Sequence, residues 1–350
     1  VLAAAAREGA VESHDVDDAV LLALDLVTIE DGVLLHADAG GLTDAEGRAI
    51  ATALSPLAAD LVPGSRVRPG VGHRLVLRVP RSASPDPLGL VPPASAIGCD
   101  VSDALPAGEG ARPYAALVEA SAELLPRLEI VQLRRDAGLP APTHVWPWGA
   151  GRSGRRLDLA ARYEQRTFAV VGRGESEAGF AALAGLPLTA PASSDPGAFT
   201  AAVLEAFEAA DAVIAWWRPP VRPDDPAGRA AAATAADTLV AGPLRAALAE
   251  RHPEDWRMAV LAGPSRSVAD GRLLGEPLMA AFEGVGFHGP LELPFVEASA
   301  AEAELRFRAG DDLLDYLLFG AGIRRPRRPR RRRSAGERAG VIPSEEAGHG

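Results

Sequence analysis

The feature that most constrains the fold is a regular alternation of short apolar runs and longer helical segments after Pro140. The short apolar runs at residues 168–171, 212–217 and 258–261 predict buried strands. Between and after them, residues 175–184, 199–210 and 228–251 have helical spacing, and residues 310–318 form a final amphipathic segment. This β-α-β-α-β order predicts a mostly parallel sheet with helices on both faces.

The first half of the chain follows a different pattern. Residues 18–29 are an apolar run that ends in Glu30-Asp31-Gly32, which predicts a strand, a tight turn and a return strand at residues 33–36. Thr43 and Glu46 have the spacing of a capping box that opens a helix to about residue 57. Residues 73–79 predict another strand, residues 81–113 are dense in turn formers, and residues 114–128 have helical spacing.

Composition restricts the class of protein. The 350 residues are 47% hydrophobic and carry a net charge of −11, which argues against a general nucleic-acid binder. No apolar run is long enough to span a bilayer. Cys99 is the only cysteine and cannot form an internal disulfide, which fits a cytoplasmic setting. The chain opens at Val1 as if within a helix, so we expect it to begin inside a longer gene product.

One segment opposes the acidic balance. Eight of the ten residues from Arg324 to Arg333 are arginine, and two prolines prevent a regular helix. We expect no fixed structure after about Ile323. The segment is interpreted either as an arm for an acidic partner or nucleic acid, or as a solvated tail enriched in arginine because all 36 basic residues of this chain are arginine.

Several collinear blocks resemble the archaeal-type cofactor-independent phosphoglycerate mutases, relatives of the alkaline phosphatases. They are Leu26-Val27-Thr28-Ile29-Glu30-Asp31-Gly32, Pro69-Gly70-Val71-Gly72-His73-Arg74, Trp146-Pro147-Trp148-Gly149-Ala150-Gly151-Arg152, Leu183-Ala184-Gly185-Leu186 and Gly242-Pro243-Leu244. The resemblance implies an α/β fold: an alkaline-phosphatase-like core with a mostly parallel sheet, interrupted by a smaller inserted α/β domain. It places a remnant of the core at residues 1–25, the insertion at 26–140, the core again at 141–323 and the arginine-rich tail at 324–350.

The resemblance also implies where catalytic groups would lie. The family converts 3-phosphoglycerate to 2-phosphoglycerate in glycolysis, with a serine nucleophile and two divalent metals, Mn or Mg, held by Asp and His. The nucleophile and the first metal-binding Asp fall in a stretch before Val1. Later positions that match family ligands hold Val221, Asp225, Gly263 and Pro264. Valine, glycine and proline side chains cannot bind a cation, so we predict no catalytic residue, no metal site and no cofactor.

Some groups that could hold a substrate are present. By resemblance Arg74, Trp148 and Arg152 would bind a phosphorylated small molecule, and Arg152 could donate bidentate hydrogen bonds to a phosphate or carboxylate. The family loop over the active site corresponds to Asp86-Pro87-Leu88-Gly89. Ala23 stands where the family has an anchoring arginine.

Polar clusters also follow two predicted strands, where ligands of open α/β sheets usually bind. They are Ser193-Ser194-Asp195 and Asp224-Asp225, together with Arg218, Arg222 and the pair Trp216-Trp217. We favour the alternative explanation, in which Ser and Asp make local turn hydrogen bonds and the arginines are solvated.

Three functions therefore stay open. The first is a catalytically inactive member of the mutase family that keeps an anion-binding cleft. The second is an active metal-dependent mutase completed by residues upstream of Val1. The third is an interaction protein that uses the arginine-rich segment.

Overall fold

The computed structural model describes residues 19–80, 89–108, 110–152, 158–219, 221, 225–269, 271–287, 294–308 and 310–320. The described residues up to Glu254, with Val260–Ala280, form one compact unit. Asp255–Ala259 and the described residues from Ala281 onward form a second. The arginine-rich segment, residues 86–88, Arg222 and Asp224 lie outside the described residues.

A five-stranded antiparallel sheet organises the first half of the chain. Its main path has the order β2-β1-β4-β3, and β5 also pairs with β1. The strands are β1 (Ala19–Glu30), β2 (Val33–His36), β3 (Arg66–Pro69), β4 (Arg74–Pro80) and β5 (His144–Arg152). The predicted strand, turn and return strand at residues 18–36 are therefore confirmed, whereas β3 was not predicted.

Strand β1 is the centre of this sheet because it is buried on both faces. Leu22, Leu24 and Leu26 belong to the larger hydrophobic core. Val27 and Ile29 point instead into a smaller core that includes Trp146. Two buried faces explain why β1 is a continuous apolar run rather than an alternating one.

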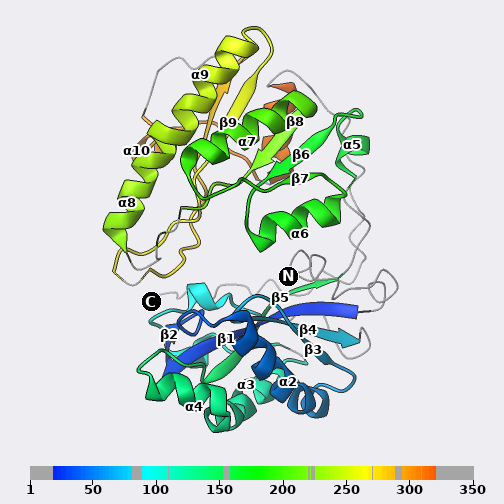
Figure 1. Ribbon diagram of the computed structural model, residues 1–350, viewed down its shortest axis with the longest axis vertical. Helices are drawn as coiled ribbons and strands as arrows, with labels where there is room; N and C mark the ends of the chain where they lie inside the picture. Colours follow the sequence, from blue (N-terminus) through cyan, green and yellow to red (C-terminus); the bar gives the residue numbers. More distant parts are fainter. Residues whose placement is uncertain are drawn as a thin grey trace, which may run out of the picture. The chain divides into compact units, whose positions relative to one another are not determined.

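Helices cover one face of the sheet (Figure 1). They are α2 (Asp44–Leu61), α3 (Arg112–Leu124) and α4 (Glu129–Asp136). The predicted capping box at Thr43 and Glu46 is present, but α2 continues through Pro56 to Leu61 rather than ending near residue 57. Helix α3 ends earlier than predicted, and a 3-10 turn at Leu125–Arg127 separates it from α4, which was not predicted.

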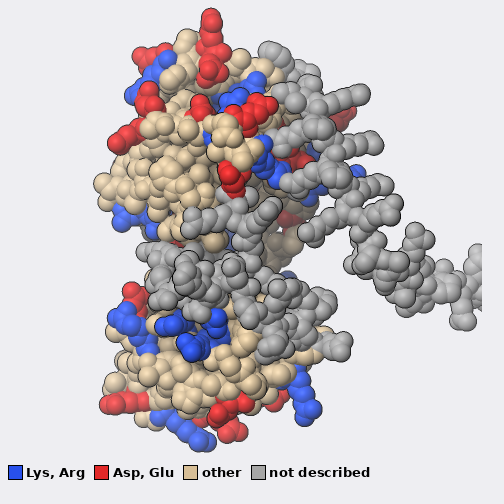
Figure 2. Space-filling view, turned by 90° about the vertical axis from the view of Figure 1, so that its right-hand side faces the viewer, with Lys and Arg blue, Asp and Glu red and all other residues tan. Residues whose placement is uncertain are grey.

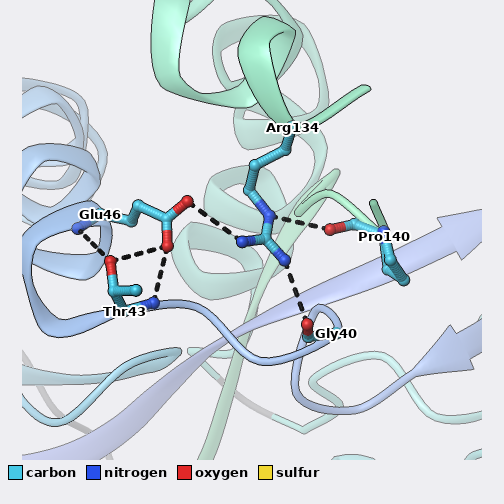
Figure 3. A network of polar contacts seen from close by, with 5 residues as sticks. All are labelled: Gly40, Thr43, Glu46, Arg134 and Pro140. Atoms are coloured by element: carbon cyan, nitrogen blue, oxygen red, sulfur yellow. Dashed lines mark hydrogen bonds and ion pairs between the residues drawn. The ribbon is translucent and has the colours of Figure 1, made fainter. Parts of the chain in front are cut away.

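A buried arginine joins these helices to the loops around the sheet (Figure 3). Arg134 on α4 donates to Glu46 at 3.1 Å, to the Gly40 carbonyl at 3.1 Å and to the Pro140 carbonyl at 2.9 Å. The same Glu46 carboxylate accepts from the Thr43 backbone. The capping box of α2 therefore also holds the end of α4.

The other face of the sheet is partly covered by residues 89–108. This segment has 3-10 turns at Pro93–Ser95 and Val101–Asp103, consistent with the predicted series of turns. The indole N–H of Trp146 donates to the Val91 carbonyl at 2.8 Å, which fixes the segment against β5.

A three-stranded parallel sheet begins the second half. Its order is β7-β6-β8, with β6 (Phe168–Val171) between β7 (Leu188–Thr189) and β8 (Ala212–Ala215). Helix α6 (Glu175–Ala184) connects β6 to β7, and α7 (Pro196–Ala209) connects β7 to β8. Helix α5 (Leu159–Arg162) precedes the sheet. The predicted parallel arrangement is confirmed for β6 and β8, whereas β7 was not predicted. The fold is mixed α/β.

The predicted helix at residues 228–251 contains an irregular turn. Helix α8 (Pro226–Ala235) passes through a π-helical segment, Ala236–Ala241, into α9 (Gly242–Arg251). Strand β9 (Arg257–Leu261) does not extend the parallel sheet as predicted. It pairs with β10 (Ala280–Gly284) in a separate two-stranded sheet.

The second unit carries α10 (Glu297–Glu302) and α11 (Gly310–Phe319), of which α11 was predicted. Its centre is a cluster of four aromatic rings from Phe282, Phe287, Phe307 and Tyr316.

The boundary predicted after residue 25 falls inside β1, and β5, which was assigned to the core, pairs with β1. The division into core and insertion stays a prediction. No helix among the described residues has both the length and the apolar character needed to cross a bilayer. On the face seen in Figure 2, acidic and basic side chains are interspersed, so the negative charge is not gathered into one patch there.

Candidate anion-binding site

The candidate site lies at the carboxyl edge of the parallel sheet. From β6 the chain passes to β7 on one side, and from β7 it returns to β8 on the other side of β6 (Figure 1). The loops that leave β6 and β8 therefore diverge, which leaves a crevice at this edge in open α/β sheets.

A pocket of about 220 Å³ occupies this position. Each of the three strands contributes the residues that directly follow it. The described lining residues are Arg173, Gly174, Pro191, Ser193, Ser194, Phe199, Trp216, Trp217 and Arg218. The lining thus combines two arginines and two serines with three aromatic residues, a composition suited to a small anion.

Arg218 reaches the pocket because the pairing of β8 extends beyond its last residue. The Trp216 N–H donates to the Val171 carbonyl at 2.9 Å, which carries the chain past the sheet edge. The Arg218 guanidinium then donates to a carboxylate oxygen of Glu177. The Glu177 residue is only 1% exposed, whereas the Arg218 side chain is 59% exposed.

Glycine is required in the turn between β6 and α6. A Cβ on Gly172 would lie 2.6 Å from the Glu177 Cγ, and a Cβ on Gly174 would lie 2.0 Å from Glu177 Oε2. The turn can hold this carboxylate only because both positions lack a side chain. Arg173, between the two glycines, donates to the Pro191 carbonyl at 2.6 Å and ties this turn to the loop after β7.

The cluster Ser193-Ser194-Asp195 makes local turn hydrogen bonds, and two of its residues also line the pocket. Asp195 caps α7 by accepting from the Ala198 N–H at 3.1 Å, and the Ser193 hydroxyl accepts from the Asp195 N–H. These are local turn bonds. Ser193 and Ser194 nevertheless line the pocket.

Arg74 and Trp148, both predicted to bind substrate, each contact a buried carboxylate. Arg74 pairs with Glu175 at 3.0 Å, and the Trp148 indole donates to Asp25 at 2.9 Å. Burial raises the pKa of Asp25 to about 7, although the Trp148 hydrogen bond and Arg74 act in the opposite direction. Burial, reinforced by Arg74, lowers the pKa of His73 to about 4.

Sequence reasoning missed Asp25, Glu175 and Glu177. Two glutamates in the first turn of a helix are ordinary on a solvent-exposed face, and nothing in the sequence indicates that both are buried here. Arg152 ends β5 opposite Val20, but its side chain lies outside the described part of the structure.

The positions that the resemblance matches to metal ligands of the family, Val221, Asp225, Gly263 and Pro264, offer few ligand atoms among the described residues. Asp225 caps α8 by accepting from the Gly228 N–H at 2.8 Å. Val221, Gly263 and Pro264 offer no ligand atom on their side chains. Within the described ranges, no group of three or more His, Cys, Asp or Glu side chains could hold a metal ion. The residues present therefore do not fit a pair of divalent cations.

The comparisons with known proteins agree on one family. The model of the 2,3-bisphosphoglycerate-independent phosphoglycerate mutases matches residues 2–130. An enzyme of that name from Methanothrix thermoacetophila is 28% identical over 305 residues, which cover 84% of this chain and 75% of the relative. The chain is thus similar to the cofactor-independent phosphoglycerate mutases in both comparisons.

Two solved structures are similar to this chain at lower sequence identity. The cofactor-independent phosphoglycerate mutase of Thermoplasma acidophilum is 18% identical, with a TM-score of 0.40 over 83% of this chain and 73% of the other. A protein of Pyrococcus horikoshii is 15% identical, with a TM-score of 0.48 over 78% of this chain and 67% of the other.

Proposed function

We propose that this chain is a member of the phosphoglycerate mutase family. We propose further that it binds a small phosphorylated acid at the carboxyl edge of the β7-β6-β8 sheet and does not catalyse metal-dependent phosphoryl transfer. The observation that carries the proposal is the pocket lined by Arg173 and Arg218 together with Ser193 and Ser194. The family name supplies the ligand class, a phosphoglycerate. We also propose the family's alkaline-phosphatase-like core and inserted domain for this chain.

The size and polarity of the pocket support a compact anion. A cavity of about 220 Å³ is smaller than the roughly 300–1,000 Å³ of most ligand pockets, so a three-carbon acid suits it better than a nucleotide. Guanidinium groups can donate paired hydrogen bonds to phosphate or carboxylate oxygens. The aromatic wall formed by Phe199, Trp216 and Trp217 limits access of water to these bonds.

The pocket lacks the groups that would activate a nucleophile. No histidine or carboxylate is among the described residues that line it beside Ser193 and Ser194. A serine hydroxyl without an adjacent base or metal is a weak nucleophile. The losses at Val221, Gly263 and Pro264 support the same conclusion, because these residues replace cation ligands of the family.

The test combines binding and turnover. Calorimetry with 3-phosphoglycerate should give weak binding, and Arg173→Gln should reduce the affinity by about tenfold or more, as expected for a charge-assisted hydrogen bond. Arg48→Gln, on the exposed face of α2, should leave it unchanged. With Mn²⁺ or Mg²⁺, conversion of 3- to 2-phosphoglycerate should proceed no faster than in buffer.

Either half of the proposal can be overturned separately. Clear mutase turnover would replace it with the metal-dependent enzyme. Failure of the wild-type protein to bind any phosphoglycerate would remove the ligand assignment.

A further inference from the structure

The first turn of α6 carries two buried carboxylates, and each is bound to an arginine from another element. Glu175 pairs with Arg74 of β4, and Glu177 pairs with Arg218 beyond β8. Acidic side chains are favoured near a helix N-terminus. The two pairs differ in one respect, because Arg218 lines the pocket whereas Arg74 does not line it.

Glu177 is buried beside the glycine turn, of which Gly174 lines the pocket. Its side chain is 0% exposed, and one carboxylate oxygen accepts from Arg218. The other, Oε2, has no hydrogen-bond partner in the described part of the chain and lies against Gly172 and Gly174. A buried carboxylate with a single partner depends on that partner, so Arg218 cannot leave it without leaving a charge unpaired in the interior.

We infer that Glu177 is an internal counter-ion that neutralises Arg218 and so sets the charge of the ligand that the pocket accepts. The inference rests on the proposed function for the identity of the pocket. With Arg218 neutralised, Arg173 is the one described guanidinium in the lining without a carboxylate partner. The negative charge of the buried Glu177 carboxylate, close to Arg218, repels a further negative charge that a ligand would bring to the same guanidinium.

The pocket should therefore bind the phosphorylated acid through its singly charged carboxylate in preference to its phosphate dianion. A carboxylate carries one negative charge, which the guanidinium of Arg173 balances. A phosphate dianion carries two, so one negative charge in the pocket has no positive partner. Glu177 acts on the ligand through Arg218, so it is a positioning residue that determines specificity and not a catalytic residue.

The test is the charge selectivity of Glu177→Gln. Calorimetry at pH 7.5 would compare inorganic phosphate and 3-phosphoglycerate with glycerate, which carries only the carboxylate. Removing the counter-ion should raise the affinity for the two phosphate ligands by about tenfold or more and change that for glycerate by less than about threefold. The salt dependence of phosphate binding should become steeper.

A matched control comes from the same helical turn. Glu175→Gln removes an equally placed buried carboxylate, but its arginine does not line the pocket. Its phosphate affinity should stay within about threefold of the wild-type value. A gain equal to that of Glu177→Gln would show a general effect of net charge and would overturn the inference.

The double variant Glu177→Gln with Arg218→Gln removes the pair without leaving an unpaired charge. Because Arg218 is already neutralised, phosphate affinity should stay within about threefold of the wild-type value. A tenfold loss would show that Arg218 acts as a free cation and would overturn the inference even if Glu177→Gln alone fails to fold.

These outcomes separate the inference from the proposed function. Phosphate binding by the wild-type protein that Glu177→Gln leaves unchanged would refute the counter-ion and keep the function. Binding that appears only in Glu177→Gln would support the counter-ion and refute phosphate binding by the natural chain. Absence of binding in both proteins would refute both.

Discussion

Asp25 is a carboxylate within a strand whose other residues from Ala19 to Ile29 are buried and nearly all apolar. It is 4% exposed, and its described hydrogen bond comes from the Trp148 indole. Burial favours the neutral acid and raises its pKa to about 7, above the value of roughly 3.9 for an exposed aspartate. The folded protein thus binds a proton at Asp25 that the unfolded chain releases.

The sign of the pH effect follows from this difference. Between about pH 4 and pH 7 the folded state holds more protons at Asp25 than the unfolded state, so the stability it contributes falls as pH rises through this window. His73 acts oppositely. Its pKa of about 4 in the folded state means that stability falls as pH drops below roughly 6.5.

Asp25→Asn should isolate the first effect. At pH 8 the variant should be more stable than the wild-type protein by about 2–4 kcal/mol, because the amide has no ionised form to bury and can still accept from Trp148. At pH 4 the two proteins should have similar free energies of unfolding in urea, since His73 contributes equally to both. A difference that does not change with pH would contradict the raised pKa.

The packing of helix α2 depends on the absence of a side chain at Gly47. Gly47 is buried inside the helix, and a Cβ there would lie 2.1 Å from the Gly72 carbonyl oxygen. Gly72 is held in this place because its N–H donates to Asp44 in the first turn of α2, and its φ of 60° favours glycine. The helix and the turn before β4 thus pack backbone against backbone.

Gly47→Ala should therefore destabilise the protein by about 1–3 kcal/mol through overpacking. Helix propensity alone predicts a gain of about 1 kcal/mol. Urea denaturation of Gly47→Ala shows whether the free energy of unfolding falls or rises. Ala49→Gly, at an exposed position of the same helix, measures the effect of helix propensity alone. It should lower the free energy of unfolding by about 1 kcal/mol. Stabilisation by Gly47→Ala would mean that the turn can move aside.

At the scale of the whole molecule, the second unit is small and depends on few interactions. Arg257 holds it together from β9. Its guanidinium donates to the Val285 carbonyl at 2.7 Å and to the carbonyls of Leu317 and Leu318 at the end of α11, and it lies over the Phe287 ring at 5.4 Å. A cation at a helix C-terminus also complements the helix dipole.

Arg257→Met should open this unit without unfolding the first. Amide hydrogen exchange in residues 281–284 and 310–319 should become about tenfold faster or more, while β1 and β4 keep their protection. Arg251→Met removes a half-exposed partner of Glu208 and should have little effect, because surface ion pairs contribute little. Faster exchange in β1 as well would show that the two units unfold together.

The sequence by itself determined the elements whose signals are local. The capping box at Thr43, the turn after Glu30 and the apolar strand at residues 168–171 were predictable because each depends on residues a few positions apart. The sequence also shows that Val221 and Gly263 have side chains without a ligand atom; that they replace metal ligands stays a prediction.

Only the tertiary structure decided the burial of charge and the pairing of strands. Nothing near Glu177 in the sequence indicates an arginine 41 positions away, and Asp25 meets Trp148 across two strands. Strand β9 has the apolar character of the other strands, yet it pairs with β10, because strand partners are chosen by packing over long distances. The ion pair between Arg218 and Glu177 joins residues far apart in the sequence, so it becomes visible only once the chain is folded.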